Sequence, residues 1–293
     1  MTMNRTFKIK KILIPFDFSE TAALSLDHAI NMAKIMDAEI VLLHIVETST
    51  FPSSISHAFS GFEKKVEEAS NEKLTELSEK IKSESGVTVH VLTEVGKIYK
   101  KIASTAKQSH IDLIMMGTHG SSGSSYTLGS NTTRVVQEAH CPVMSFQTHA
   151  NRIGFQKIIL PIDDSQESRQ KVPFAAELAI YYKAQVQIVG LMQSANEDYQ
   201  RKFKIKIEQV EDYFNQHGVS CNAHYYSGDL AKNTIKATEE LHGDLLVVMT
   251  EQESGLTGLL MGTYASKVIN GSKIPVMTVR PAEIDPDRIT VTF

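Results

Sequence analysis

Short runs of apolar residues alternate with amphipathic stretches along the whole chain. Residues 12–16 form a continuous apolar run, which is typical of a parallel strand buried on both faces. The next stretch opens with Ser19 and Glu20, a helix cap followed by a first-turn acid, and apolar residues then recur at helical spacing (Ala22, Leu26, Ala29 or Ile30, Ala33 and Met36). The pattern predicts a strand followed by a helix.

The same alternation continues to the middle of the chain. Strand-like runs recur at 39–46, 87–95, 111–116 and 142–146, and an amphipathic helix is expected at 62–85. Strands separated by helices indicate an α/β fold with a doubly wound, five-stranded parallel sheet and right-handed crossovers. Sheets of this kind bind ligands beyond the carboxyl ends of their strands, where the strand order reverses.

The chain repeats this unit. Pro15 and Asp17 match Pro161 and Asp163, 146 positions later, whereas Gly96 matches Gly228, 132 positions later. The first copy therefore holds 14 extra residues before Gly96, and the Ser- and Pro-rich segment 47–61 is the predicted insertion.

The repeat sets the expected domain boundaries. We expect two tandem domains at 1–148 and 155–281, followed by a C-terminal tail at 282–293. The tail ends in the alternating sequence ITVTF. Two readings stay open for it, a strand added to a neighbouring sheet or an unstructured end.

Composition narrows the class of protein. The formal net charge of -4 and the balanced charged fraction of 22% give no electrostatic footprint for nucleic acid or anionic lipid. Two cysteines fit a reducing compartment, and the N-terminal apolar run is too short for a signal segment or a membrane span. These features predict a soluble, cytoplasmic protein that uses neither nucleic acid nor membrane as a partner.

A glycine- and serine-rich loop follows the apolar run at 111–116. Residues 117–132 read GTHGSSGSSYTLGSNT, and a helix is expected to begin near Ser130. Neutral hydroxyl and amide donors at a helix N-terminus favour an anion such as phosphate. The loop lacks the lysine of a P-loop and the spacing of a dinucleotide fingerprint. Loop and helix together predict a phosphate cradle.

These motifs resemble the universal stress protein family, once in each half of the chain. The opening IPFDFSETA and the series Gly117, Gly120, Gly129, Ser130 carry the resemblance, although eight residues separate Gly120 from Gly129 where the family has nine. The resemblance implies a Rossmann-like, adenine nucleotide α-hydrolase-like fold that binds ATP, with or without Mg²⁺. Its implied nucleotide-binding residues here are Pro15, Asp17, Ile40, Met116, Gly117, His119, Gly120, Gly129, Ser130 and Asn131.

Two of these residues have a plainer alternative. Asp17 is also placed to cap the following helix, and His119 is equally consistent with an exposed loop residue. His140 and Cys141 have no spaced partner that would make a metal site, so a structural cysteine is expected.

The second copy has lost much of the motif. Met249 and Gln252 replace the two leading glycines, and Glu251 and Glu253 add negative charge beside the expected phosphate position. Side chains at these positions block the close approach of backbone amides, and carboxylates repel phosphate. We therefore expect one working nucleotide site per chain, in the first half, with the second half as a structural partner.

The resulting functional hypothesis is an ATP-binding stress-response regulator with unknown protein partners. A nucleotide-independent interaction scaffold is the main alternative, and a slow ATPase or self-phosphorylating protein is the third. No catalytic residue and no metal ligand set is predicted. The apolar strands at 142–146 and 275–279 are expected to pair the halves as an internal pseudo-dimer, or two chains as a homodimer.

Overall fold

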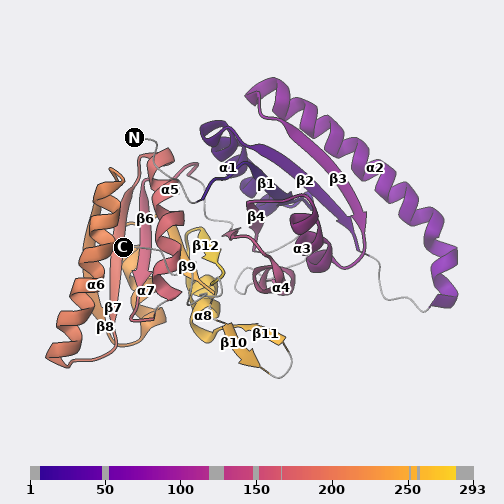
Figure 1. The fold of residues 1–293 in the computed structure, drawn as a ribbon. Coiled ribbons are helices and arrows are strands. Elements are labelled where there is room, and N and C mark those ends of the chain that lie inside the picture. Colours follow the sequence, from indigo (N-terminus) through magenta and orange to yellow (C-terminus); the bar gives the residue numbers. More distant parts are fainter. Residues whose placement is uncertain are drawn as a thin grey trace. The chain divides into compact units, whose positions relative to one another are not determined.

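The computed structural model describes residues 7–47, 53–118, 129–147, 152–165, 167–250, 252–255 and 258–281. These form two compact units, one at Ile9–Ile153 and a second that begins at Gly154 and also includes Phe7 and Lys8. Each unit is described by itself below (Figure 1).

Strands and helices alternate strictly in the first unit. Its elements are β1 (Lys11–Pro15), α1 (Glu20–Met36), β2 (Glu39–Val46), α2 (Ser53–Ser85), β3 (Val89–Val95), α3 (Ile98–Gln108), β4 (Leu113–Gly117), α4 (Ser130–Glu138) and β5 (Val143–Phe146). The described strands pair in parallel in the order β3-β2-β1-β4-β5. The order reverses between β1 and β4, and this is the switch point where a ligand is expected.

Helices cover both faces of this sheet. Helix α1 packs against α2, and α3 packs against α4. The residues of α1 that face the sheet are buried at helical spacing (Ala22, Leu26, Ala29, Met32, Ala33 and Met36). The predicted doubly wound α/β fold and the predicted Ser19 cap are both confirmed, since Ser19 Oγ accepts a hydrogen bond from the Ala22 amide at 3.2 Å.

The second unit repeats the design. Its elements are β6 (Lys157–Ile162), the 3₁₀ helix η1 (Glu167–Lys171), α5 (Val172–Tyr182), β7 (Gln185–Met192), α6 (Glu197–Gln216), β8 (Cys221–Ser227), α7 (Leu230–Glu240), β9 (Leu245–Met249), β10 (Gln252–Gly255), β11 (Gly258–Met261), α8 (Thr263–Gly271) and β12 (Val276–Val279). Its main sheet is parallel in the order β12-β9-β6-β7-β8, and β10 and β11 form a separate antiparallel hairpin. This hairpin was not anticipated from the sequence.

The same arrangement of hydrogen bonds is found at the start of the first strand in each half. Asp112 accepts from the amides of Lys10 and Lys11, and Asp244 accepts from the amides of Gln156 and Lys157, all at 2.8–2.9 Å. These aspartates satisfy backbone amides at the starts of β1 and β6. The repeat detected in the sequence is therefore also a repeat of contacts.

The insertion in the first half forms part of a long helix. Helix α2 has 33 residues, whereas α6 at the corresponding place has 20. Figure 1 shows α2 running alongside β3. The helix predicted at 62–85 therefore starts earlier, at Ser53, inside the segment predicted as the insertion.

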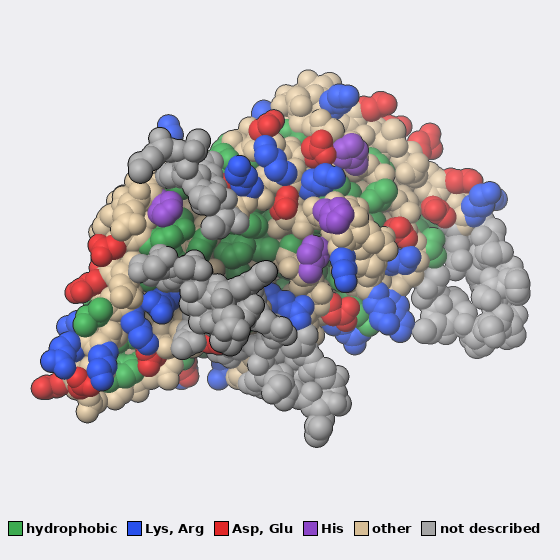
Figure 2. Space-filling model, viewed as in Figure 1, with side chains coloured by type: hydrophobic (Ala, Val, Ile, Leu, Met, Phe, Trp, Pro, Cys, Tyr) green, Lys and Arg blue, Asp and Glu red, His purple; other side chains and the backbone are tan. Residues whose placement is uncertain are grey.

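Charged side chains of both signs are interspersed over the face shown in Figure 2, in keeping with the net charge of -4. Among the described residues, none of the helices is both long and apolar enough to cross a bilayer.

Candidate nucleotide site

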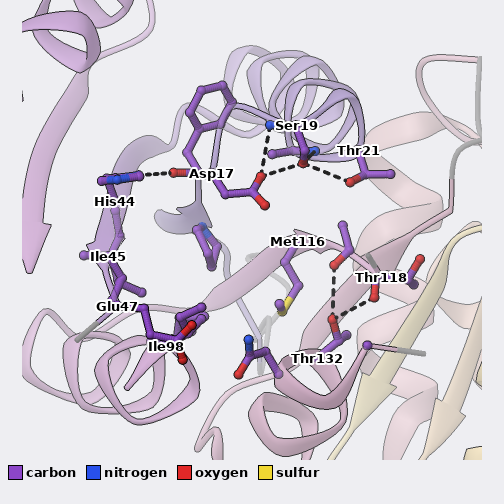
Figure 3. Close-up of a pocket in the computed structure, with 18 of the residues that line it drawn as sticks. Asp17, Ser19, Thr21, His44, Ile45, Glu47, Ile98, Met116, Thr118 and Thr132 are labelled. Atoms are coloured by element: carbon purple, nitrogen blue, oxygen red, sulfur yellow. Dashed lines mark hydrogen bonds between the residues drawn. The ribbon is translucent and has the colours of Figure 1, made fainter. Parts of the chain in front are cut away.

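A cavity of about 390 Å³ lies at the switch point of the first sheet (Figure 3). It is bounded by the carboxyl ends of β1, β2 and β4 and by the first turn of α4, with residues of α1 and α3 completing it. This size is within the range of small-molecule sites. Seven of the predicted site residues line it: Pro15, Asp17, Met116, Gly117, Gly129, Ser130 and Asn131.

A tight turn carries Asp17 from β1 into α1. Asp17 Oδ1 accepts hydrogen bonds from the Ser19 amide at 3.1 Å and the Ser19 hydroxyl at 2.5 Å. Phe18 between them has a positive φ of 62°, which is uncommon for a bulky residue and marks a constrained turn. Asp17 thus holds the cap residue Ser19, which in turn caps the helix, and its carboxyl group still borders the cavity.

Gly117 brings the end of β4 against the start of α1. A Cβ on Gly117 would stand 2.6 Å from Thr21 Oγ1 and 2.7 Å from Thr21 Cβ. Real Cβ atoms do not approach other atoms so closely, so a larger residue here would push the two elements apart. Glycine is required at this position by packing.

Gly129 allows a second close approach, between two backbone segments. Its amide donates to the Thr118 carbonyl at 2.9 Å, and a Cβ on it would stand 2.7 Å from the same oxygen. The Thr132 hydroxyl also donates to the carbonyls of Gly117 and Thr118, at 3.2 and 3.3 Å. These bonds fix the first turn of α4 beside the end of β4.

The start of α4 presents donors to the cavity. Gly129 is its N-cap and has no side chain to satisfy the first amides, and the first turn contains no acidic residue. Ser130, Asn131 and Thr132 all line the cavity. Free amides and the positive end of the helix dipole favour an anion here.

The wall formed by β2 differs from the expectation. Ile40 is fully buried in the sheet, paired with Ile12 and Val89, and does not line the cavity. Ile45, together with His44 and Glu47, stands there instead at the carboxyl end of the strand. The prediction that Ile40 lines the pocket for the nucleobase is therefore wrong. A residue near the start of a parallel strand lies at the opposite edge of the sheet from the expected ligand position.

Two predicted site residues, His119 and Gly120, lie outside the described residues. Several cavity residues were missed from the sequence, among them Ser19, Thr21, His44, Ile98, Thr118 and Thr132. Those that directly follow or end a strand could have been found from the rule that parallel sheets bind at their carboxyl edge.

The second half is remodelled at the corresponding place. Asp163 holds Ser165 just as Asp17 holds Ser19, at 2.9 and 2.6 Å. Met249 replaces Gly117, however, and the chain opposite it, Glu167–Lys171, is a 3₁₀ helix in place of the first turns of an α-helix. The close helix–strand contact that Gly117 permits has no equivalent with methionine there.

A buried amine distinguishes this second region. Lys171, which corresponds to Ser25, is 2% exposed, and its Nζ donates to the carbonyl and hydroxyl of Ser168 at 2.5 and 3.1 Å. Burial lowers the pKa of Lys171 to about 7, although the charge of Asp163 acts to raise it. The second half therefore buries an amine where the first half has Ser25, which is itself fully buried and donates to the Ala22 carbonyl at 2.8 Å.

Comparison with known proteins agrees with this architecture. The model of the universal stress protein family matches residues 8–146 and again 154–280. The chain is 36% identical to Universal stress protein MJ0531 of Methanocaldococcus jannaschii over 139 residues, which is 46% of this chain and 80% of that protein. It is 31% identical to Universal stress protein MJ0577 of the same organism over 150 residues, 46% of this chain and 93% of that protein.

A solved structure extends the similarity to both halves. The crystal structure of a universal stress protein from Archaeoglobus fulgidus covers 96% of this chain and 99% of its own, with a TM-score of 0.74 and 19% sequence identity. At this identity the likeness concerns the fold. The two matches to the family model cover most of the sequence, and the chain therefore belongs to the universal stress protein family, in a tandem two-domain form.

Proposed function

We propose that the first half binds an adenine nucleotide in the cavity at its switch point, and that nucleotide occupancy makes the protein a regulator of a stress response. One observation carries this proposal: the N-terminus of α4, which has no side-chain cap, lines the cavity at the carboxyl ends of β1 and β4. An anionic group suits the helix N-terminus, and a flat apolar group suits the space between Pro15, Ile45 and Met116.

The charges that line the cavity bear on whether the nucleotide binds together with a metal cation. Asp17 and Glu47 line it, and none of its described lining residues is a lysine or an arginine. The loop segment 119–128 contributes no lysine or arginine in the sequence either. Phosphates facing carboxylates without a fixed cation repel them. We therefore propose that ATP binds with Mg²⁺, which supplies the missing positive charge.

The second half is proposed to act as a structural partner that does not bind nucleotide. Met249 takes the place of Gly117, and the positions matching His44 and Glu47 are Gly190 and Gln193. A Cβ on Gly190 would meet the rings of Tyr225 and Phe203 at 3.1 and 3.2 Å, so aromatic side chains occupy the space around this position.

Calorimetric titration with Mg-ATP tests the proposal through a stoichiometry of one nucleotide per chain. Gly129→Ala should abolish binding because its Cβ would collide with the Thr118 carbonyl. Gly262→Ala, at the matching N-cap of α8, is the control and should retain the stoichiometry. If Mg-ATP neither binds nor raises the melting temperature at millimolar concentration, the nucleotide-independent scaffold is the better description.

A further inference from the structure

The buried amine of Lys171 is held by one nearby residue of the same 3₁₀ helix. Its Nζ donates to the Ser168 carbonyl at 2.5 Å and to the Ser168 hydroxyl oxygen at 3.1 Å. Within the part of the chain that the structure describes, this amine has no other hydrogen-bond partner. The Ser168 hydroxyl also accepts from the Asp163 amide at 3.0 Å, so the amine is joined to the turn that follows β6.

The number of acceptors favours an uncharged amine. A neutral amine has two N–H groups, and Ser168 offers it two acceptors. An ammonium has three N–H groups and a full charge, so protonation would bury a third donor and a charge with too few partners. The pKa of Lys171, lowered by burial to about 7, agrees with this count of donors and acceptors.

The elements around Lys171 supply little compensating charge. Helix η1 packs against β6, β9 and α5, and every residue of β9 is apolar. The titratable or charged side chains on η1, on α5, on β6 and in the turn after it are Lys157, Asp163, Asp164, Glu167, Arg169, Glu177, Tyr181 and Tyr182. Asp163 is the residue whose charge acts to raise the pKa of Lys171. Asp164 is ion-paired with Lys206, and Arg169 donates to Gln209.

The segment that Lys171 anchors is weak by itself. Residues 167–171 form a 3₁₀ helix, whereas the matching residues 21–25 belong to α1. Pro173 follows at the start of α5. It has no amide to donate, and in a continuous α-helix its ring would clash with the Arg169 carbonyl. Because 3₁₀ hydrogen bonds have poorer geometry than α-helical ones, η1 depends strongly on side-chain contacts such as those of Lys171.

We propose that η1 is a pH-sensitive latch on the second half, held closed by the neutral amine of Lys171 and released when that amine is protonated. Release places the ammonium in water and frees the Ser168 carbonyl. It also uncovers part of β9, whose residues are all buried in the closed form. Acidification thereby makes apolar surface available in the second half, independently of nucleotide binding in the first.

The direction of the effect follows from linkage. Lys171 has a pKa of about 7 in the closed form and an ordinary value of 10.5, which it regains once it is in water. The open form therefore binds the proton more tightly. Opening becomes more favourable as the pH falls from about 10 to about 7, and it levels off below 7.

Hydrogen exchange of the full chain at pH 8.5 and 6.5, read by mass spectrometry and corrected for the intrinsic pH dependence of exchange, tests the latch. A peptide that contains Glu167–Lys171 reports on η1, and one from β7, which is paired with a strand on each side, reports on global unfolding. Lys171→Met cannot take up a proton, and Lys171→Arg stays charged. Lys232→Met, on the exposed face of α7, is the matched control.

The η1 peptide should be less protected than the β7 peptide at both pH values. Its protection factor should fall at least about tenfold from pH 8.5 to 6.5. Lys171→Met should remove the fall, Lys171→Arg should give low protection at both pH values, and Lys232→Met should behave as the unmodified protein. Equal protection of η1 and β7 would overturn the latch, because η1 would then open only with the whole unit. An unchanged protection factor in the unmodified protein, or a fall that persists in Lys171→Met, would overturn it as well.

Discussion

Thr21 and Gly117 are in such close contact that the start of α1 and the end of β4 fit only because position 117 has no side chain. The distance from a Cβ at Gly117 to Thr21 Oγ1 would be 2.6 Å. This contact sets one boundary of the cavity, so the packing of α1 on β4 and the shape of the cavity depend on the same pair.

We expect Gly117→Ala to lower the free energy of unfolding by about 1–3 kcal/mol, the usual cost of overpacking. Urea denaturation followed by circular dichroism gives this value. Thr21→Gly removes the two side-chain atoms that the new Cβ would meet, so the double variant should recover stability relative to the sum of the single changes. Strict additivity of the two changes would show that the contact is not the cause.

Lys171 makes the stability of the second half depend on pH. In the folded chain burial lowers the pKa of Lys171 from 10.5 to about 7, so between those values the unfolded chain binds a proton that the folded chain does not. The free energy of unfolding should therefore rise with pH from about 7 to about 10 and be smallest below 7.

The variant Lys171→Met should remove this dependence. Burying an apolar chain of similar length avoids the cost of a buried amine, so the variant should be more stable below pH 7 and show a flatter pH profile. Urea midpoints at pH 6, 7.5 and 9 measure both effects, with Lys232→Met on the exposed face of α7 as control. If the free energy of unfolding of Lys171→Met still rises with pH as steeply as in the unmodified protein, other titratable groups cause the dependence.

In the turn after β1, Ser19 caps helix α1 and Asp17 holds Ser19 in place. Ser19→Ala removes the acceptor for the Ala22 amide and should cost about 1 kcal/mol of stability. Asp17→Asn keeps an oxygen that can accept from Ser19 and should cost less than Ser19→Ala in the same denaturation experiment. A larger loss for Asp17→Asn would mean that its charge, rather than its hydrogen bonds, holds the turn.

The two thiols should react slowly in the native protein. Burial raises the pKa of Cys141 to about 12, and burial raises the pKa of Cys221 to about 11, so little of either is present as thiolate at pH 8. Titration with Ellman's reagent should reach two thiols per chain rapidly only after denaturation. Fast modification of either thiol in the native protein would contradict this expectation.

Much of the fold could be predicted from the sequence, because burial on both faces gives parallel strands an unmistakable apolar run. The strand at 39–46 was placed with the bounds that β2 has, and Ser19 was identified as a cap. The hairpin β10–β11 was not foreseen, since QESG and GLLM lack the alternation that marks a half-exposed strand.

The site was less predictable than the fold. Motif residues such as Gly129 follow from local sequence. Ile40 was implied by the family resemblance, and it shares its strand and its apolar character with Ile45. Only Ile45 lines the cavity, because it lies at the carboxyl end of β2. Lys171 gave no signal in the sequence, since lysines are mostly exposed, and its burial depends on the 3₁₀ helix opposite Met249.

The ring of Phe7 packs against that of Phe174 with centroids 4.3 Å apart, so residues ahead of β1 complete the second unit. During translation Phe7 leaves the ribosome long before Phe174 is synthesised. The second unit therefore gains a contact from a piece of chain that is made before the first unit. For that contact to form, the segment ahead of β1 must remain accessible until Phe174 has been made.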